Sequence, residues 1–316
     1  MVRSATGLST WTWEMAGPPG SPALLLLHGW MATAALNWYG SLEFLGRSFS
    51  VVAPNLRGHG RQGRGAPPFS VEACADDLAA LINELSLGPA IVVGYSMGGA
   101  IAQMLARRHR EAVHGLVLCA TAASFARRIK LRPAVRIVGR FSASAARKWP
   151  EAAHHFLDWR IARHDRTAQR RYHRDDEQLP GSDGGLSETR DGPLVEEVSD
   201  EATAHGRAFT PGAFDGRPGW AFAERTMSDL AAFIEAGAEL NAYDSSSWLP
   251  ELEVPAAVLV TARDQVVAPW RQEAMAALIR GARRYVVDAG HDAVVAKPGV
   301  FLPVLRDACG ELAKLS

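Results

Sequence analysis

The chain has 316 residues with 34 basic and 34 acidic side chains, which gives a formal net charge of +0. This balance provides no overall electrostatic attraction to nucleic acid or acidic membranes, so we expect no nucleic-acid partner. Hydrophobic residues make up 47% and charged residues 22%, as in average folded domains, which excludes disordered and membrane-embedded classes. The length suits one α/β domain that carries a large insertion.

The N-terminal residues and the cysteines indicate the compartment. The first ten residues, MVRSATGLST, lack the apolar core of a secretory signal, and the apolar run Ala23–Leu27 is too short to span a bilayer. Cys74, Cys119 and Cys309 are widely spaced and lack the neighbours of a metal site or a disulfide frame. We therefore expect a cytoplasmic protein with buried, reduced thiols, no transmembrane segment, no metal and no cofactor. The oligomeric state stays open.

Short apolar runs alternate with amphipathic helical patterns, which is typical of a mostly parallel sheet covered by helices on both faces. The sequence predicts an edge strand at Thr10–Met15 and central strands at Ala23–Leu27, Phe49–Pro54, Ala90–Gly94, Gly115–Ala120, Ala256–Thr261 and Arg283–Asp288. It predicts helices at Ser70–Leu87, Met97–Arg110, Pro269–Ile279 and Pro298–Leu315.

This alternation stops between Ser124 and Pro250, where no strand is indicated. We therefore assign residues 124–250 to a mainly helical cap, and residues 1–123 and 251–316 to an α/β core. Basic residues dominate from Arg127 to Arg174 and acidic residues from Asp175 to Glu201. A solvated helical face whose charges neutralise each other is the simpler interpretation, and a patch that binds lipid headgroups is the alternative.

The segment Val92–Gly99, VVGYSMGG, contains a GxSxG sequence that follows an apolar strand and opens a helix. Such a turn holds the serine, Ser96, in a strained conformation, and a Cβ at Gly94 or Gly98 would collide with the tightly packed strand and helix. A nucleotide-binding turn is the alternative, but the GxGxxG and GK[ST] patterns are absent. Ser96 is therefore the candidate nucleophile.

A serine hydroxyl needs a base to remove its proton, and the base needs an acid to orient it. His291 lies just past the last predicted strand, after Gly290, where the loop can turn back over the sheet edge. Asp264 ends the run VLVTARD, at the end of another strand. Asp288 and Asp292 are rival acids because they lie close to His291 in the sequence. Neighbouring residues of an extended chain point their side chains apart, however, which disfavours both.

Hydrolysis of an ester also needs donors aimed at the developing oxyanion. We expect the backbone N–H groups of Met97, which follows the nucleophile, and Trp30, which follows the first central strand, to supply them. The predicted substrate pocket comprises His28, Gly29, Trp38 and Tyr95, with the side chains of Trp30 and Met97 as further candidates. For the aromatic residues at strand ends, core packing is an equally good explanation.

At this point the chain resembles the α/β-hydrolase superfamily. The resemblance rests on LLLLHGW at Leu24–Trp30, NLRGHGR at Asn55–Arg61, VVGYSMGG, and the pair TARD and AGHD, in this order along the chain. It implies the α/β-hydrolase fold, a Ser–Asp–His triad and a structural role for His59 in the RGHG loop. A serine at position 96 disfavours haloalkane dehalogenases and epoxide hydrolases of this fold, which use an aspartate there.

The expected activity is cleavage of a carboxylic ester, or a related acyl substrate, through an acyl-enzyme. A cofactor-free perhydrolase or haloperoxidase, a thioesterase and a carbon–carbon hydrolase are alternatives with the same triad, and a ligand-binding receptor on this scaffold is an alternative from another class. We expect the cap to control access, with Gly181–Glu201 as its most mobile stretch. Its predicted apolar contacts with the acyl chain are Phe156, Trp159, Phe209, Phe214 and Trp220.

Overall fold

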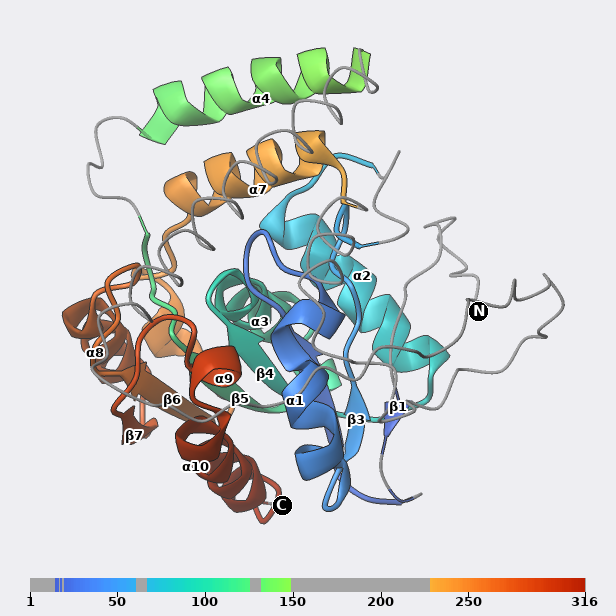
Figure 1. Cartoon of the computed structure of the whole chain (residues 1–316), viewed down its shortest axis with the longest axis vertical. Coiled ribbons are helices and arrows are strands. Elements are labelled where there is room, and N and C mark those ends of the chain that lie inside the picture. Colours follow the sequence, from blue (N-terminus) through green and yellow to red (C-terminus); the bar gives the residue numbers. More distant parts are fainter. Residues whose placement is uncertain are drawn as a thin grey trace, which may run out of the picture.

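The computed structural model describes residues 15–16, 18, 20–60, 67–125, 132–148 and 228–315. These residues form a seven-stranded sheet flanked by helices, in the order β1-β3-β2-β4-β5-β6-β7 (Figure 1). The strands are β1 Met15–Ala16, β2 Ala23–Leu27, β3 Ser50–Val52, β4 Ala90–Tyr95, β5 Val113–Cys119, β6 Ala256–Thr261 and β7 Arg283–Val287. All adjacent strands pair in parallel except β1, which runs antiparallel to β3.

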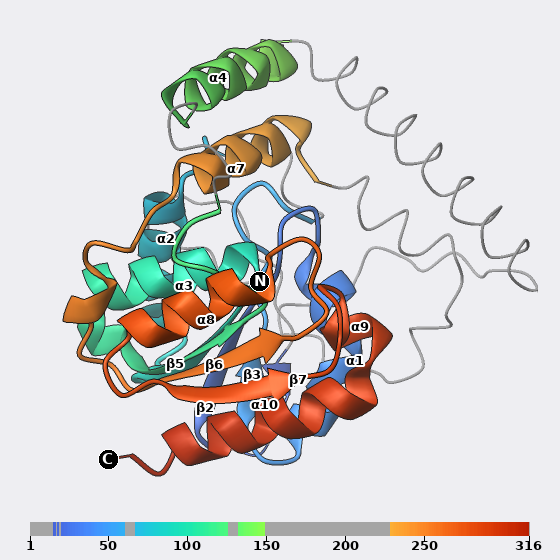
Figure 2. The same cartoon turned by 90° about the vertical axis from the view of Figure 1, so that its left-hand side faces the viewer.

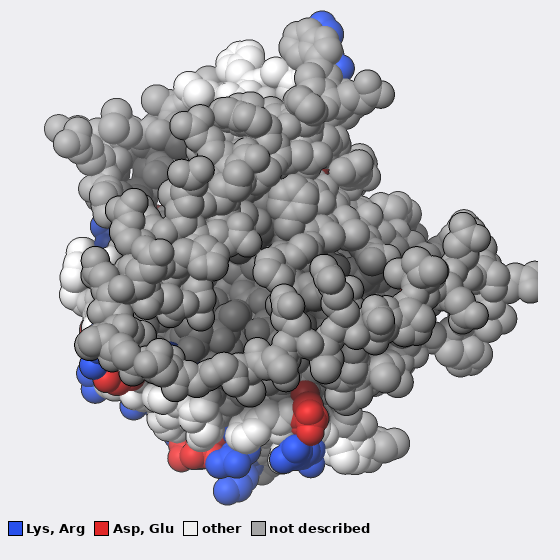
Figure 3. Space-filling view, in the orientation of Figure 1, with Lys and Arg blue, Asp and Glu red and all other residues white. Residues whose placement is uncertain are grey.

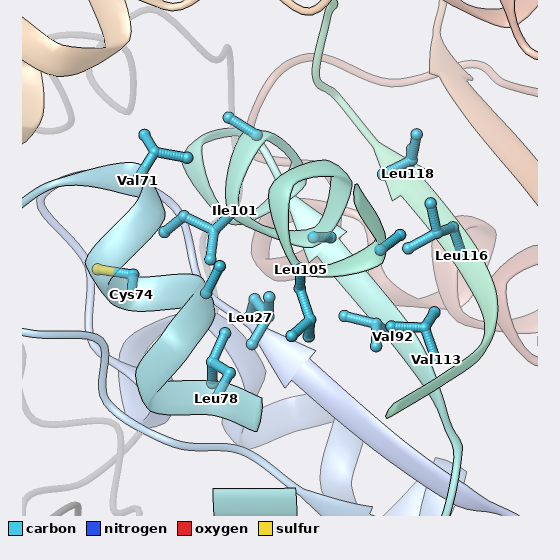
Figure 4. Packing of buried hydrophobic residues seen from close by; sticks show 14 of the residues in the cluster. Leu27, Val71, Cys74, Leu78, Val92, Ile101, Leu105, Val113, Leu116 and Leu118 are labelled. Atoms are coloured by element: carbon cyan, nitrogen blue, oxygen red, sulfur yellow. The ribbon is translucent and has the colours of Figure 1, made fainter. Parts of the chain in front are cut away.

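Helices cover both faces of the sheet. They are α1 Ala34–Gly46, α2 Val71–Glu84, α3 Met97–Arg108, α4 Arg132–Lys148, α7 Leu230–Ala242, α8 Pro269–Leu278, α9 Ala293–Ala296 and α10 Pro298–Leu312. The apolar side chains of α2, α3 and α8 pack on one face and those of α1, α9 and α10 on the other. Figure 4 shows the first of these layers, where Leu27 and Val92 of the sheet meet Leu78 of α2 and Ile101 of α3.

The predicted strands and helices of the core are confirmed, with ends shifted by a few residues. The side chain of Ser70 accepts a hydrogen bond from Ala73 N and caps α2, as its position before the helix indicates. Of the predicted edge strand Thr10–Met15, only Met15 lies among the described residues, where it begins β1. All three cysteines are free and buried, as expected.

Helix α1 is absent from the sequence-based prediction. Its interior holds Asn37 and Gly40, which weaken a helical pattern, and it has no acidic residue in its first turn. Two signals were nevertheless present in the sequence. Thr33 caps the helix through Leu36 N, and Trp38, Leu42 and Leu45 follow the helical spacing of a buried face.

The nucleophile region lies where the strand order reverses. From β2 the chain adds β3 on one side and then β4 on the other, so the carboxyl ends of β2 and β4 are neighbours. In open α/β sheets, ligands bind in the crevice outside the strand ends at such a point. The loops after β2 and β4 are therefore the first place to look for a site.

The described part of the predicted cap consists of residues 124–125, α4 and the segment 228–250, which contains α7. Figures 1 and 2 show α7 lying between α4 and the loops at the carboxyl edge of the sheet. A Cβ at Gly139 of α4 would lie 2.5 Å from the Ala238 side chain, so the two helices approach closely. Arg147 of α4 forms an ion pair with Glu235 of α7. Gly181–Glu201 and the five apolar cap residues predicted to contact substrate lie outside the described residues.

Charges of both signs are interspersed on the described surface. Along the lower edge of the view in Figure 3, basic and acidic side chains lie next to one another. Among the described residues, no helix has the length and apolar character needed to cross a membrane. The same part of the chain holds no group of three or more side chains arranged to bind a metal ion.

Candidate active site

The turn between β4 and α3 holds Ser96 in a conformation that L-residues rarely adopt. Its φ is +54° and its ψ is −113°, which projects the side chain away from both elements. A Cβ at Gly94 would lie 2.5 Å from the carbonyl oxygen of Gly98, and a Cβ at Gly98 would lie 2.4 Å from that of Leu27. The predicted need for glycine at both positions is therefore confirmed.

The carboxyl end of the neighbouring strand β5 holds the backbone of Ser96 through both its N–H and its carbonyl group. Its N–H donates to the Cys119 carbonyl at 2.9 Å, and its carbonyl accepts from the Thr121 hydroxyl at 2.8 Å. Both partners lie at the carboxyl end of β5. These bonds offset the strain of the turn and leave the hydroxyl of Ser96, on a residue that is 9% exposed, available for other contacts.

The structure brings Ser96, His291 and Asp264 together in one hydrogen-bonded chain. His291 Nε2 lies 3.0 Å from Ser96 Oγ, and His291 Nδ1 lies 2.8 Å from Asp264 Oδ2. His291 follows β7 and Asp264 follows β6, so the carboxyl ends of three strands contribute one member each. With Nδ1 donating to the carboxylate, Nε2 is left to accept the serine proton.

Asp264 is the most enclosed member, and its side chain is fully buried. Burial alone raises the pKa of this carboxyl, but hydrogen bonds from His291, Val267 N and Thr261 and the charge of His291 lower it, and the net pKa is below its ordinary value. Gln272 Nε2 donates to the same carboxylate oxygen at 3.2 Å. The acid is therefore held ionised and in a single orientation.

The rival acids lie elsewhere. Asp288 is exposed and pairs with the guanidinium of Arg263, and Asp292 is exposed at the start of α9. Neither has a hydrogen bond to His291 in the structure. The geometry therefore favours Asp264, as the strand-end argument predicts.

The loop after β2 lies directly against the nucleophile. A Cβ at Gly29 would lie 3.6 Å from Ser96 Cβ, which is van der Waals distance, so this loop and the nucleophile are direct neighbours. Gly29 N donates to Asn37 Oδ1 at 2.9 Å, and the next residue, Trp30, carries one of the predicted oxyanion donors. The other, Met97, is the first residue of α3, and an N–H group at this position has no carbonyl partner one turn earlier in the helix. The role of both N–H groups stays a prediction.

The side chains of His28, Trp38 and Tyr95, which are predicted to line the pocket, pack into the core. His28 and Trp38 are 0% exposed and Tyr95 is 3% exposed. His28 Nε2 accepts from Leu56 N, which fixes the loop after β3 to the loop after β2. Trp38 and Tyr95 contact each other edge to face, with ring centroids 6.0 Å apart. A contact between these side chains and substrate stays a prediction.

His59 is buried among other rings, in agreement with the structural role that the family resemblance implies. Its ring lies 5.1 Å from that of His28 and 5.0 Å from that of Phe233. Its Nδ1 donates to the Arg57 carbonyl at 2.9 Å. Burial lowers the pKa of His59 to about 4, although its hydrogen bond to Arg57 and the charge of Asp229 oppose this shift.

Sequence reasoning did not identify the residues that support the triad. Thr261 and Gln272 hold Asp264, Tyr95 holds the main chain of His291, and Asn37 holds Gly29. Thr261 belongs to the TARD motif, and its spacing of three residues from Asp264 was a usable signal. Gln272 and Asn37 are polar residues on helices, where a solvent-facing position is the ordinary expectation.

Comparisons with known proteins agree with this fold. A family model described as alpha/beta hydrolase fold matches residues 22–298. The pimeloyl-[acyl-carrier protein] methyl ester esterase of Neisseria meningitidis serogroup C is 26% identical over 92% of this chain and 94% of its own length. A thermophilic esterase from Thermogutta terrifontis superposes with a TM-score of 0.63 at 26% identity, covering 96% of this chain and 94% of that one.

Other relatives match only in part. The AB hydrolase superfamily protein YisY of Bacillus subtilis is 38% identical over 32% of this chain. The chain covers 28% to 38% of the length of this and similar curated relatives. A hydrolase from Pseudomonas aeruginosa PA01, with a TM-score of 0.66 at 21% identity, covers 98% of this chain and 97% of its own, and shares the fold. Because the family model spans most of the sequence, the chain belongs to the alpha/beta hydrolase fold family.

Proposed function

We propose that this protein is a serine hydrolase that cleaves carboxylic esters through an acyl-enzyme. The observation that carries the proposal is the chain of two hydrogen bonds from Ser96 Oγ to His291 Nε2 and from His291 Nδ1 to Asp264. A nucleophile within hydrogen-bond reach of a base, itself oriented by a carboxylate, is the arrangement that activates serine.

In the first half-reaction Ser96 Oγ attacks the ester carbonyl carbon while His291 Nε2 takes the hydroxyl proton. The carbonyl π electrons move to its oxygen, which becomes the oxyanion. Asp264 stabilises the imidazolium and keeps Nδ1 protonated. The tetrahedral intermediate then expels the alkoxide, which takes the proton from His291 and leaves as the alcohol.

The oxyanion is stabilised by the backbone N–H groups of Trp30 and Met97 and by the positive end of α3. Gly98 makes this possible, because a Cβ there would lie 2.4 Å from the carbonyl oxygen of Leu27 and would force the nucleophile turn away from the end of β2.

In the second half-reaction water attacks the acyl carbon of Ser96 and gives its proton to His291. The oxyanion forms again, and its collapse breaks the bond to Ser96 Oγ, which recovers the proton from His291. The acyl group leaves as the carboxylic acid. No cofactor is needed for any of these steps.

The comparisons support this reaction class. The relative from N. meningitidis is named a methyl ester esterase, and the structure from T. terrifontis is described as an esterase. Both match this chain over almost its whole length. At 26% identity the substrate does not transfer from either of them, so the acyl chain and the alcohol are left to experiment.

The test is a substrate panel with the wild-type protein and the Ser96→Ala variant. We expect turnover of p-nitrophenyl esters with release of carboxylic acid, complete loss in Ser96→Ala, and labelling of Ser96 alone by a fluorophosphonate probe. Faster turnover of acyl-thioesters or vinylogous diketones, or peracid formation, would reassign the reaction. Tight binding of a small molecule without product release would instead indicate a receptor.

A further inference from the structure

Outside the triad, the loop after β2 contacts helix α7 through the side chain of Trp30. Trp30 Nε1 donates to the Phe233 carbonyl at 2.9 Å, 203 residues along the chain. This carbonyl lies inside α7, where it also faces the N–H of Gly237 one turn later. A carbonyl oxygen has two lone pairs, so it accepts the indole without loss of the helical bond.

Gly237 makes room for this indole. A Cβ at position 237 would lie 2.8 Å from Trp30 Cζ2, which is closer than Cβ atoms approach other atoms, and 3.3 Å from Cη2, so the indole would have to shift. Glycine is unfavourable inside a helix, so its presence at this position calls for a packing reason. The close approach of the indole is that reason.

Helix α7 is itself fixed to the loops around the site. Asp229 N donates to the Gly58 carbonyl at 2.9 Å, and Glu235 accepts from Phe69 N at 2.7 Å while pairing with Arg147 of α4. A Cβ at Gly58 would lie 2.0 Å from Ala232, so the helix also packs tightly on the RGHG loop. The helix is therefore a firm support for whatever rests on it.

We propose that Trp30 is a positioning residue whose indole, seated on Gly237 and Phe233 of α7, sets the position of its own backbone N–H in the oxyanion site. The inference rests on the proposed function, because it takes the Trp30 N–H to be an oxyanion donor. It adds that a helix of the cap region determines how well this donor is aimed. The side chain acts through the backbone and does not itself touch the reacting atoms.

The consequence is a defined kinetic signature. An oxyanion donor acts mainly in the transition state, so its displacement lowers kcat and kcat/KM together and leaves KM unchanged. A misplacement approaching 1 Å costs up to about 100-fold in rate. A residue that only lined the substrate pocket would change KM instead.

The experiment is a double-mutant cycle of Gly237→Ala and Trp30→Phe, with Gly40→Ala as the matched control. Gly40 lies inside α1 and is exposed, and a Cβ added there would have no heavy atom within 4 Å. Phenylalanine lacks the indole N–H and the ring atoms that would meet the new Cβ. Rates are expressed per active site, counted by fluorophosphonate labelling, so that loss of folded protein does not imitate loss of kcat.

We expect Gly237→Ala and Trp30→Phe each to lower kcat by about tenfold to 100-fold at constant KM. Binding of a boronic acid, whose adduct imitates the oxyanion, should weaken by a similar factor. In the Trp30→Phe background, Gly237→Ala should cost nothing further, because the clash is gone. Gly40→Ala should retain the wild-type kcat.

A wild-type kcat in Trp30→Phe, a change confined to KM, or losses that multiply in the double variant would overturn the inference. Trp30→Phe decides the matter alone if Gly237→Ala does not fold. Failure of the proposed function would be seen separately, as ester turnover that is absent from the wild type or that survives Ser96→Ala.

Discussion

The phenolic hydroxyl of Tyr95 donates a 2.6 Å hydrogen bond to the main-chain carbonyl of His291. Tyr95 ends β4 and immediately precedes the nucleophile, so one strand supports both Ser96 and the loop that carries the base. The Tyr95 ring packs edge to face against Phe301 with centroids 5.8 Å apart, which restricts its motion. Nucleophile and base therefore share one support in the core.

Replacing Tyr95 by Phe should remove this bond and keep the ring. We expect a loss of about 1 kcal/mol in the free energy of unfolding and a fall in kcat of up to about tenfold, because the His291 loop is less firmly held. Tyr285→Phe is the matched control, since it also removes one hydroxyl hydrogen bond, to Glu311, but at β7 on the sheet edge. Equal kcat values in the two variants would contradict the positioning role of Tyr95.

The positive φ of Ser96 should be measurable as stored strain. Ser96→Ala and Ser96→Gly both remove the hydroxyl and should be inactive, but only glycine adopts this conformation without steric cost. We expect Ser96→Gly to exceed Ser96→Ala by about 1 kcal/mol in free energy of unfolding. Urea denaturation of the two variants provides the comparison, and a less stable glycine variant would count against the strain.

Replacement of the acid should separate Asp264 from Asp288. Asp264→Asn is expected to lower kcat by about ten-thousandfold, because an amide does not hold His291 in the tautomer that accepts the serine proton. Asp288→Asn removes only an exposed ion pair with Arg263, so we expect little change in kcat. Steady-state kinetics on one ester decides, and an inactive Asp288→Asn variant would show that the acid is misassigned.

Two buried imidazoles should make the protein sensitive to acid. Burial, with a further contribution from the charge of His59, lowers the pKa of His28 to about 3, and burial lowers the pKa of His59 to about 4. Both pKa values lie below the ordinary value of about 6.5. Between pH 6.5 and these lower values, the unfolded chain therefore binds more protons than the folded chain. Stability is therefore fully present above about pH 6.5 and is lost as the pH falls toward these folded values.

We expect the free energy of unfolding to fall by about 1.4 kcal/mol per pH unit for each of these histidines below their unfolded pKa. Urea denaturation at pH 7, 6 and 5 measures this slope. His59→Gln should reduce the slope by the contribution of one proton. A stability that is independent of pH between 6.5 and 5, or an unchanged slope in the variant, would contradict the assignment.

The strands, helices and motifs that are formed by contiguous residues were predicted well. The central strands are runs of apolar residues between turn signals, and such runs allow few other structures in a chain of this composition. The nucleophile turn was recognised because its glycines and its serine are contiguous. Helix α1 was missed because its asparagine and glycine obscure a pattern that becomes regular only when its buried face is known.

The support of the site depends on contacts between distant segments, which no local pattern encodes. Trp30 and Phe233 are 203 residues apart, and Tyr95 and His291 are 196 residues apart. Such pairs form only when the order of the strands brings their ends to one edge of the sheet. The sequence by itself determined the strand-and-helix alternation, the reactive serine and the candidate base and acid, because each follows from residue types within a few positions. Only the tertiary structure decided which carboxylate meets His291, which polar side chains hold the triad, and how deeply a side chain such as Trp38 is buried. Burial and hydrogen-bond geometry are properties of the assembled fold, which is the physical reason.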